Sequence, residues 1–192
     1  MPVVWPWPRN RGHRRGSAPR VAPAPPEGPL ADPAFVAGLR PIPSAPPGTG
    51  SPWPAADIVG VSPAGASVGA RLGGSDGLVL LAFLATSCEG CEEFWRGLRD
   101  GADVDLPGSV TVVAVTRGPG TIPPADVDEV ATGIVRVPVI MSDTAWTDYR
   151  VSGYPFFVLV EAQSRRVVGE TVGFGWPDVV SMVRAATGAD ES

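Results

Sequence analysis

The chain has 192 residues, and 44% of them are hydrophobic, which suits one folded domain with an extension. Residues 1–30 contain five Arg and one Glu, whereas the remainder contains 10 Arg and 19 acidic residues. The part of the chain that can fold is therefore acidic. Since an acidic surface repels phosphate backbones, we expect no nucleic-acid partner.

The sequence contains no segment typical of a membrane span. The longest apolar run, Leu78–Ala85, has eight residues, against the ~20 that a spanning helix needs. The N-terminus also lacks the apolar core of a secretory signal. We expect a cytoplasmic protein as written, with an extracytoplasmic, membrane-anchored form as the alternative if the true start lies upstream. Sequencing the mature N-terminus distinguishes the two.

Proline divides the chain into two regions. Residues 1–54 hold 15 of the 23 prolines, and proline lacks the amide donor that regular structure uses. We expect residues 1–51 to form a disordered Pro/Arg-rich tail and residues 52–190 to form the folded domain. A spacer is the favoured role for the tail, ahead of docking through polyproline segments or contact of its Arg residues with an anionic membrane surface.

The folded region opens with signals for a hairpin, a strand and a helix. The turn Pro63-Ala64-Gly65 separates short strands at 58–61 and around 67–68. The run Leu78–Leu84 is apolar throughout, as a strand buried on both faces would be. A helix follows from about Cys88 to Arg99, with Thr86 and Ser87 as candidate caps and Gly101 as terminator. Its apolar face is expected to comprise Cys91, Phe94, Trp95 and Leu98.

Strands and helices then alternate to the end of the chain. We expect strands at 110–115, 137–141, 156–160 and 165–172, and helices at 124–131, 143–150 and 177–187. The last helix should be amphipathic, with Val179, Val180, Val183 and Ala186 on its apolar side. This order predicts an α/β fold, with a mixed sheet flanked by helices, an N-terminal β-hairpin, a parallel portion and a closing antiparallel hairpin.

The only two cysteines, Cys88 and Cys91, stand three positions apart, directly after the buried strand. Two cysteines cannot form a disulfide scaffold. The single His, His13, lies in the tail, so the domain lacks the further ligands of a zinc site, and we expect no metal or other cofactor. A CxxC pair between a strand and a helix is typical of a redox dithiol, which we favour over an inert disulfide or two buried thiols.

The predicted position of the pair gives each sulfur a different role. At a helix N-terminus, the free amides and the positive end of the helix dipole favour the thiolate of Cys88. Cys88 would attack a target disulfide, and the more buried Cys91, one turn further on, would release the product. The sequence therefore predicts a thiol–disulfide oxidoreductase with Cys88 and Cys91 as catalytic residues.

Two segments carry a family resemblance. Leu80–Cys91 resembles the active-site segment of TlpA-like disulfide reductases in the thioredoxin superfamily, and Tyr149–Val160 resembles their cis-proline segment. The resemblance covers about residues 52–187. It implies a cis peptide at Tyr154-Pro155, facing the CxxC, with these two residues binding the substrate strand.

The chain departs from the family pattern at three places. Ser87 stands where a Trp often precedes the first cysteine, and Ala82 stands where a polar or acidic residue is frequent. Glu89, Glu92 and Glu93 crowd the helix start, and their charge opposes formation of the Cys88 thiolate. We therefore hypothesise that the pair acts as a reductant rather than a strong oxidant.

The expected partners are protein dithiol or disulfide substrates and an upstream thiol reductant, with the protein acting as a monomer. Two alternatives remain. A thioredoxin-fold peroxidase commonly has Thr three residues before its reactive cysteine, whereas Thr86 is two before Cys88. A non-catalytic binding module would use the fold as a scaffold and the tail as its contact.

Overall fold

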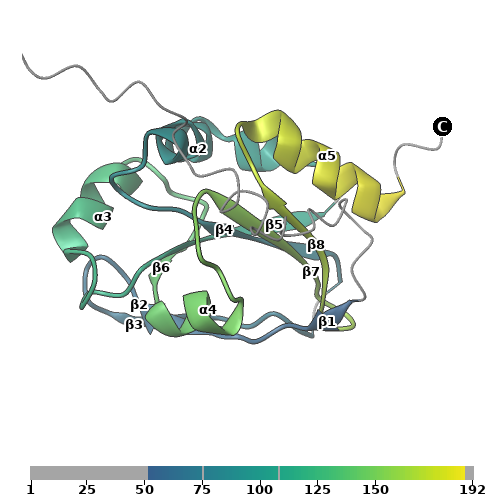
Figure 1. Ribbon diagram of the computed structural model, residues 1–192, viewed down its shortest axis with the longest axis horizontal. Helices are drawn as coiled ribbons and strands as arrows, with labels where there is room; N and C mark the ends of the chain where they lie inside the picture. Colours follow the sequence, from purple (N-terminus) through teal and green to yellow (C-terminus); the bar gives the residue numbers. More distant parts are fainter. Residues whose placement is uncertain (1–51, 75, 108, 189–192) are drawn as a thin grey trace, which may run out of the picture. The chain divides into compact units, whose positions relative to one another are not determined.

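The computed structural model describes residues 52–74, 76–107 and 109–188. The expected tail, residues 1–51, lies outside the described residues, as do residues 189–192. The described part contains an eight-stranded sheet in the order β1-β8-β7-β4-β5-β6-β2-β3 (Figure 1). Its class, a mixed α/β sheet flanked by helices, is the one the sequence predicts.

Most elements lie where the sequence pattern puts them. The strands are β1 (Trp53–Pro54), β2 (Ile58–Val61), β3 (Ser67–Ala70), β4 (Leu78–Phe83), β5 (Val110–Thr116), β6 (Val139–Met141), β7 (Phe156–Glu161) and β8 (Arg166–Val172). The helices are α2 (Glu89–Asp100), a short 3-10 helix (Ala102–Asp105), α3 (Pro124–Ala131), α4 (Asp143–Asp148) and α5 (Trp176–Thr187).

The sheet combines parallel and antiparallel pairs. Strands β4, β5 and β6 run parallel, as their connection through helices requires. Strand β7 pairs antiparallel with β4 and with β8, and the hairpin β2–β3 joins the other edge through β6. The two-residue strand β1, which the sequence analysis does not anticipate, pairs antiparallel with β8, Trp53 opposite Val167.

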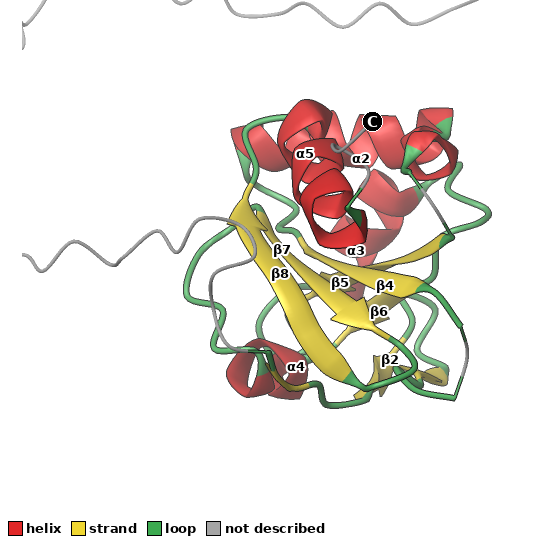
Figure 2. Cartoon of the chain, turned by 90° about the vertical axis from the view of Figure 1, so that its right-hand side faces the viewer, coloured by secondary structure: helices red, strands yellow, loops and turns green. Residues whose placement is uncertain are grey.

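Helices cover both faces of the sheet, and each face has its own apolar core (Figure 2). Helices α2, α3 and α5 lie on one face, and α4 lies on the other. Strand β4 is buried on both faces, with Leu80, Leu81, Ala82 and Phe83 all at 0% exposure. This double burial explains why its sequence is a continuous apolar run, and it makes β4 a rigid support for the loop that follows.

Two helices differ from the sequence prediction at their ends. Helix α4 ends at Asp148 rather than Arg150, because Arg150 adopts a left-handed conformation with φ of 53° that a helix cannot continue. Helix α5 buries Val179, Met182 and Val183, whereas Ala186, expected on its apolar side, is exposed. Ala186 belongs to the last turn of the helix, where the chain has passed beyond the core.

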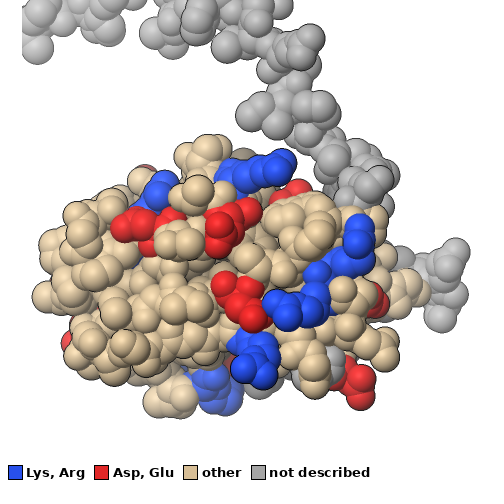
Figure 3. All heavy atoms as spheres, turned by 90° about the horizontal axis from the view of Figure 1, so that it is seen from below, with Lys and Arg blue, Asp and Glu red and all other residues tan. Residues whose placement is uncertain are grey.

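Charged side chains of both signs stand next to one another on the face seen in Figure 3. The ion pairs among the described residues include Arg165–Asp57, at 2.9 Å. None of the helices in the described part of the chain is both long and apolar enough to cross a membrane.

Candidate active site

The predicted cysteine pair lies at the start of α2, but the helix cap is not the predicted one. Cys88 itself is the N-cap, with φ of −109° and ψ of 118°, and its Sγ accepts a hydrogen bond from the Cys91 N–H at 3.1 Å. The expectation that Thr86 or Ser87 caps the helix is therefore wrong. The thiol satisfies the free amide that a hydroxyl would otherwise take, so Cys88 Sγ lies against the positive end of the helix.

Cys91 lies one turn further on, with 0% of its surface exposed. Its neighbours belong to the apolar core that contains Ala82 and Phe94. Its Sγ accepts a hydrogen bond from the Ala85 N–H at 3.4 Å. Burial raises the pKa of the Cys91 thiol to about 12, and the nearby Cys88 sulfur adds to this, while the Ala85 N–H works against it. Both cysteines are free thiols, and Cys88 is only partly buried.

The loop between β4 and α2 is tied to the helix through one residue. Besides the bond from its N–H to Cys91, Ala85 accepts a hydrogen bond at its carbonyl oxygen from Trp95 Nε1 at 3.0 Å. Trp95 is buried, with 3% exposed. These two contacts fix the loop on both sides of the peptide and so position Cys88 at the surface.

The predicted cis peptide at Tyr154-Pro155 is present. Pro155 is buried and lies beside the start of α2, since a Cβ added at Gly90 would stand 3.6 Å from Pro155 Cδ and 3.9 Å from Cys88 Sγ. Tyr154 is 50% exposed and meets the Trp146 ring edge-on at 6.1 Å. The structure thus brings together all four residues that the sequence analysis singles out.

A third loop also reaches the helix start, which the sequence analysis misses. A Cβ added at Gly175 would lie 3.1 Å from Glu93 Oε1, so the segment between β8 and α5 packs against α2 just after its first turn. This segment presents Phe174, which is 87% exposed. An aromatic residue between Gly173 and Gly175, at a strand-to-helix junction, is the signal that sequence reading could have used.

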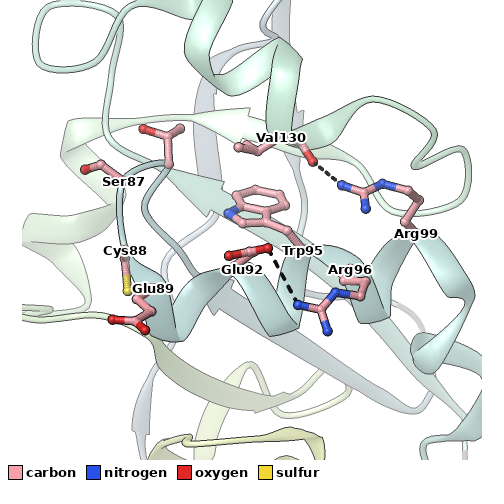
Figure 4. Close-up of a pocket in the computed structure, with 9 residues that line it drawn as sticks. Ser87, Cys88, Glu89, Glu92, Trp95, Arg96, Arg99 and Val130 are labelled. Atoms are coloured by element: carbon pink, nitrogen blue, oxygen red, sulfur yellow. Dashed lines mark hydrogen bonds and ion pairs between the residues drawn. The ribbon is translucent and has the colours of Figure 1, made fainter.

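A cleft of about 350 Å³ opens next to Cys88. It runs along α2 and is closed on one side by Val130 of α3 (Figure 4). It carries the exposed Glu89 near the sulfur and the exposed Glu92 further along, beside Trp95 (Figure 4). Within residues 52–188, apart from the undescribed positions 75 and 108, no three His, Cys, Asp or Glu side chains gather as a metal site would require.

Solved structures with the same arrangement of strands and helices define the fold. A thiol:disulfide interchange protein of the thioredoxin family from Chlorobium tepidum matches with a TM-score of 0.55 at 20% sequence identity, over 71% of this chain and 97% of its own. A thiol:disulfide interchange protein from Bacteroides sp. matches with a TM-score of 0.53 at 19% identity, over 74% and 93%. A thioredoxin-like protein from Aeropyrum pernix matches with 0.52 at 15% identity, over 67% and 89%.

No protein-family model matches the chain, and no curated protein matches its sequence. At these identities the structural similarity defines a fold. The chain therefore has a thioredoxin-like fold, similar to that of thiol:disulfide interchange proteins, with a CxxC pair at the start of its first described helix.

Proposed function

We propose that this protein is a thiol–disulfide oxidoreductase that reduces protein disulfides. The Cys88 thiolate attacks one sulfur of the client disulfide; a Cys88–client S–S bond forms, the client S–S bond breaks, and the departing client sulfur takes up a proton. Cys91 then loses its proton and attacks Cys88 Sγ. The client leaves as a dithiol, and Cys88 and Cys91 are left joined as a disulfide, so two electrons have passed to the client.

One observation carries this proposal: a partly exposed sulfur caps a helix, and a second, fully buried sulfur follows one turn later. The exposed sulfur has the access and the hydrogen-bond donor that a nucleophile needs. The buried sulfur is shielded from outside reagents and is suited to resolve the intermediate. An inert structural disulfide would need neither an exposed first sulfur nor a buried second one.

The substrate contacts in this proposal are Tyr154 and Pro155. Pro155 borders Gly90 and Cys88, and Tyr154, the residue before it in the chain, exposes half of its surface. We propose that an extended client segment lies along this loop and pairs with the backbone of Tyr154, as a strand added to a sheet edge does. Main-chain pairing suits an enzyme that acts on several client sequences.

The reducing direction rests on charge. Glu89 and Glu92 are in the first turn of α2, and Glu93 follows them. Negative charge at this position counteracts the helix dipole and disfavours an unusually stable thiolate, which is the property of strong oxidants. A thiol reductant upstream would restore the dithiol. Equilibration with glutathione tests the direction, and a potential as high as about −120 mV would contradict it.

The roles of the two cysteines are tested by single substitutions. We expect Cys88→Ser to lower the rate of reduction of a protein disulfide such as that of insulin by at least about a thousandfold, because the nucleophile is gone. Cys91→Ser should instead accumulate a covalent Cys88–client disulfide, visible by mass spectrometry without reductant. Normal turnover by Cys88→Ser would rule out the proposed function.

A further inference from the structure

The cleft beside Cys88 has an organisation that the exchange chemistry alone does not explain. Its α2 residues form a stripe along one side of the helix, at positions 88, 89, 92, 95, 96 and 99. Figure 4 shows Cys88 and Ser87 at one end of the cleft, Arg96 and Arg99 at the other, and the Trp95 ring between them. The cleft therefore leads away from the reactive sulfur to a pair of guanidinium groups.

The two ends of the cleft carry opposite charge. Glu89 lies beside the sulfur, whereas Arg96 and Arg99 stand at the distal end, and Glu92 lies between them next to Trp95 (Figure 4). Arg96 makes only a long, exposed ion pair with Glu92, at 3.7 Å and with side-chain exposures of 59% and 75%. Such a pair contributes little and exchanges easily with another carboxylate.

Arg99 is fixed in place without being neutralised. Its Nε donates to the Thr132 carbonyl oxygen at 3.0 Å, and its NH2 group donates to the Val130 carbonyl oxygen at 3.2 Å. No carboxylate of the described residues forms an ion pair with it. The guanidinium keeps further N–H donors and its full charge, and holding it against α3 removes most of the entropy cost of binding an anion.

The axial distance along α2 between the two ends of the cleft matches a short extended peptide. Cys88 and Arg99 are eleven positions apart on α2, or about 16 Å along the axis at ~1.5 Å per residue. An extended chain advances ~3.3 Å per residue and covers this length in about five residues. Arg96, eight positions from Cys88, is reached in about four residues by the same measure. A client segment whose cysteine meets Cys88 would thus bring a side chain about four to five positions away to Arg96 and Arg99.

We propose that this cleft is a client-binding subsite that selects protein segments with an Asp or Glu about five residues from the reactive cysteine. The inference rests on the proposed oxidoreductase function and adds a sequence preference to it. Arg96 and Arg99 receive the client carboxylate, and Trp95 and Val130 border the segment between the two ends. Tyr154 and Pro155 lie outside this cleft, so the preference is separate from main-chain pairing.

The test uses peptides that carry one cysteine as a mixed disulfide with 5-thio-2-nitrobenzoate, whose release by Cys88 is coloured. The peptides differ only at the fifth residue from the cysteine, which is Glu, Gln or Lys, placed on either side. We expect, for one of the two placements, rate constants in the order Glu, Gln, Lys, separated by about two- to fivefold each, the range of a solvent-facing ion pair. High salt should remove the difference.

Variants assign the preference to the two Arg residues. Arg99→Gln should remove most of the preference for Glu, and Arg99→Lys should keep part of it. Since Arg99 also joins α2 to α3, Arg96→Gln, whose residue makes no such bond, provides a second test in a protein that keeps this link. Arg184→Gln, an exposed substitution on α5 outside the cleft, is the matched control and should keep the full preference.

The possible outcomes distinguish failure of the proposed subsite from failure of the proposed oxidoreductase function. Equal rates for the three peptides in both placements, with release still dependent on Cys88, overturn the subsite and leave the oxidoreductase function standing. A preference that survives both Arg96→Gln and Arg99→Gln overturns the assignment to this cleft. Release no faster than by Cys88→Ser overturns both proposals together.

Discussion

At the scale of single residues, the two sulfurs differ because their surroundings differ. Cys88 caps the N-terminus of α2 and is partly exposed to solvent, whereas Cys91 is enclosed by apolar side chains. The buried position six residues before Cys88 is Ala82, which has no group to accept a proton. Deprotonation of Cys91 is therefore the step that its environment opposes most, and the second half of the exchange should respond strongly to pH.

This contrast predicts how the thiols react with iodoacetamide. In Cys88→Ser, burial, which is the largest cause of the raised pKa of the Cys91 thiol, is kept, so alkylation of Cys91 should continue to rise with pH from pH 7 to 10. Mass spectrometry after quenching measures it. The unfolded variant is the control and should level off near the ordinary thiol pKa. A plateau below pH 9 in the folded variant would contradict the burial argument.

The sequence identifies the cysteines and the cis-proline residues because each belongs to a short pattern next to a recognisable strand. It does not identify Cys88 as the cap, since that depends on where the helix begins within one or two residues. Arg99 and Phe174 are also missed. Arg99 is held by hydrogen bonds to the carbonyl oxygens of Val130 and Thr132, 31 and 33 residues away, and Phe174 belongs to a loop that packs on α2. Neither contact can be read from the local sequence.

At the scale of elements, α2 and α5 lie on the same face of the sheet (Figure 2) and pack closely where Trp176 meets Gly97. The Trp176 ring lies over Gly97, and a Cβ at Gly97 would stand 2.7 Å from Trp176 Cδ1. Phe94 and Phe157 also pack against the Trp176 ring, and their ring centroids lie 5.5 and 6.4 Å from its centroid. Gly97 is therefore required for close packing, although glycine in a helix interior costs ~1 kcal/mol relative to alanine.

Gly97→Ala should lower the free energy of unfolding by about 1–2 kcal/mol, because overpacking against Trp176 outweighs the gain in helix propensity. Urea denaturation measures it. Gly120→Ala is the matched control, since a Cβ there meets nothing within 4 Å, and it should leave stability unchanged or slightly higher. In a Trp176→Phe background the cost should shrink; a cost that persists there would place the cause elsewhere.

The sequence predicts elements well where one physical signal dominates. The buried strands β4, β5 and β7 are long runs of apolar, mostly β-branched or aromatic residues, and α2 has a strict helical period. Strand β1 has two residues, one of them proline, and exists only because β8 offers it an edge. Its formation is decided by tertiary pairing, which no local pattern records.

At the scale of the whole molecule, each of the two cores on either side of the sheet buries one ionisable group. Cys91 lies in one core and Tyr149 in the other. Burial raises the pKa of Tyr149 above its usual value, despite the 2.6 Å hydrogen bond that its hydroxyl donates to the Ala56 carbonyl oxygen. Both groups keep their protons longer in the folded state than in the unfolded one.

The folded protein in reducing buffer should therefore lose stability at alkaline pH. Below the ordinary thiol pKa of 9.0 the contribution of Cys91 is complete, and it is lost as the pH rises towards 12, because only the unfolded chain releases the proton in this window. Urea denaturation at pH 8 and 10.5 should show a loss on the order of 1–2 kcal/mol from this group. Cys91→Ala should show a shallower pH dependence, and parallel profiles would count against this account.

The hydrogen bond between the Cys91 amide and Cys88 Sγ joins two equilibria that are usually discussed apart. The same amide also donates to the Cys88 carbonyl oxygen at 2.9 Å. The sulfur that caps the first turn of α2 is also the atom that gains and loses a covalent partner, so oxidation alters a helix end each time it occurs. Each change of redox state at Cys88 is therefore also a change in the capping of α2. A substitution in that turn that stabilises one redox form more than the other shifts the reduction potential by the same free energy. The difference in stability between the two redox forms therefore reports how far folding moves the potential from that of the unfolded dithiol.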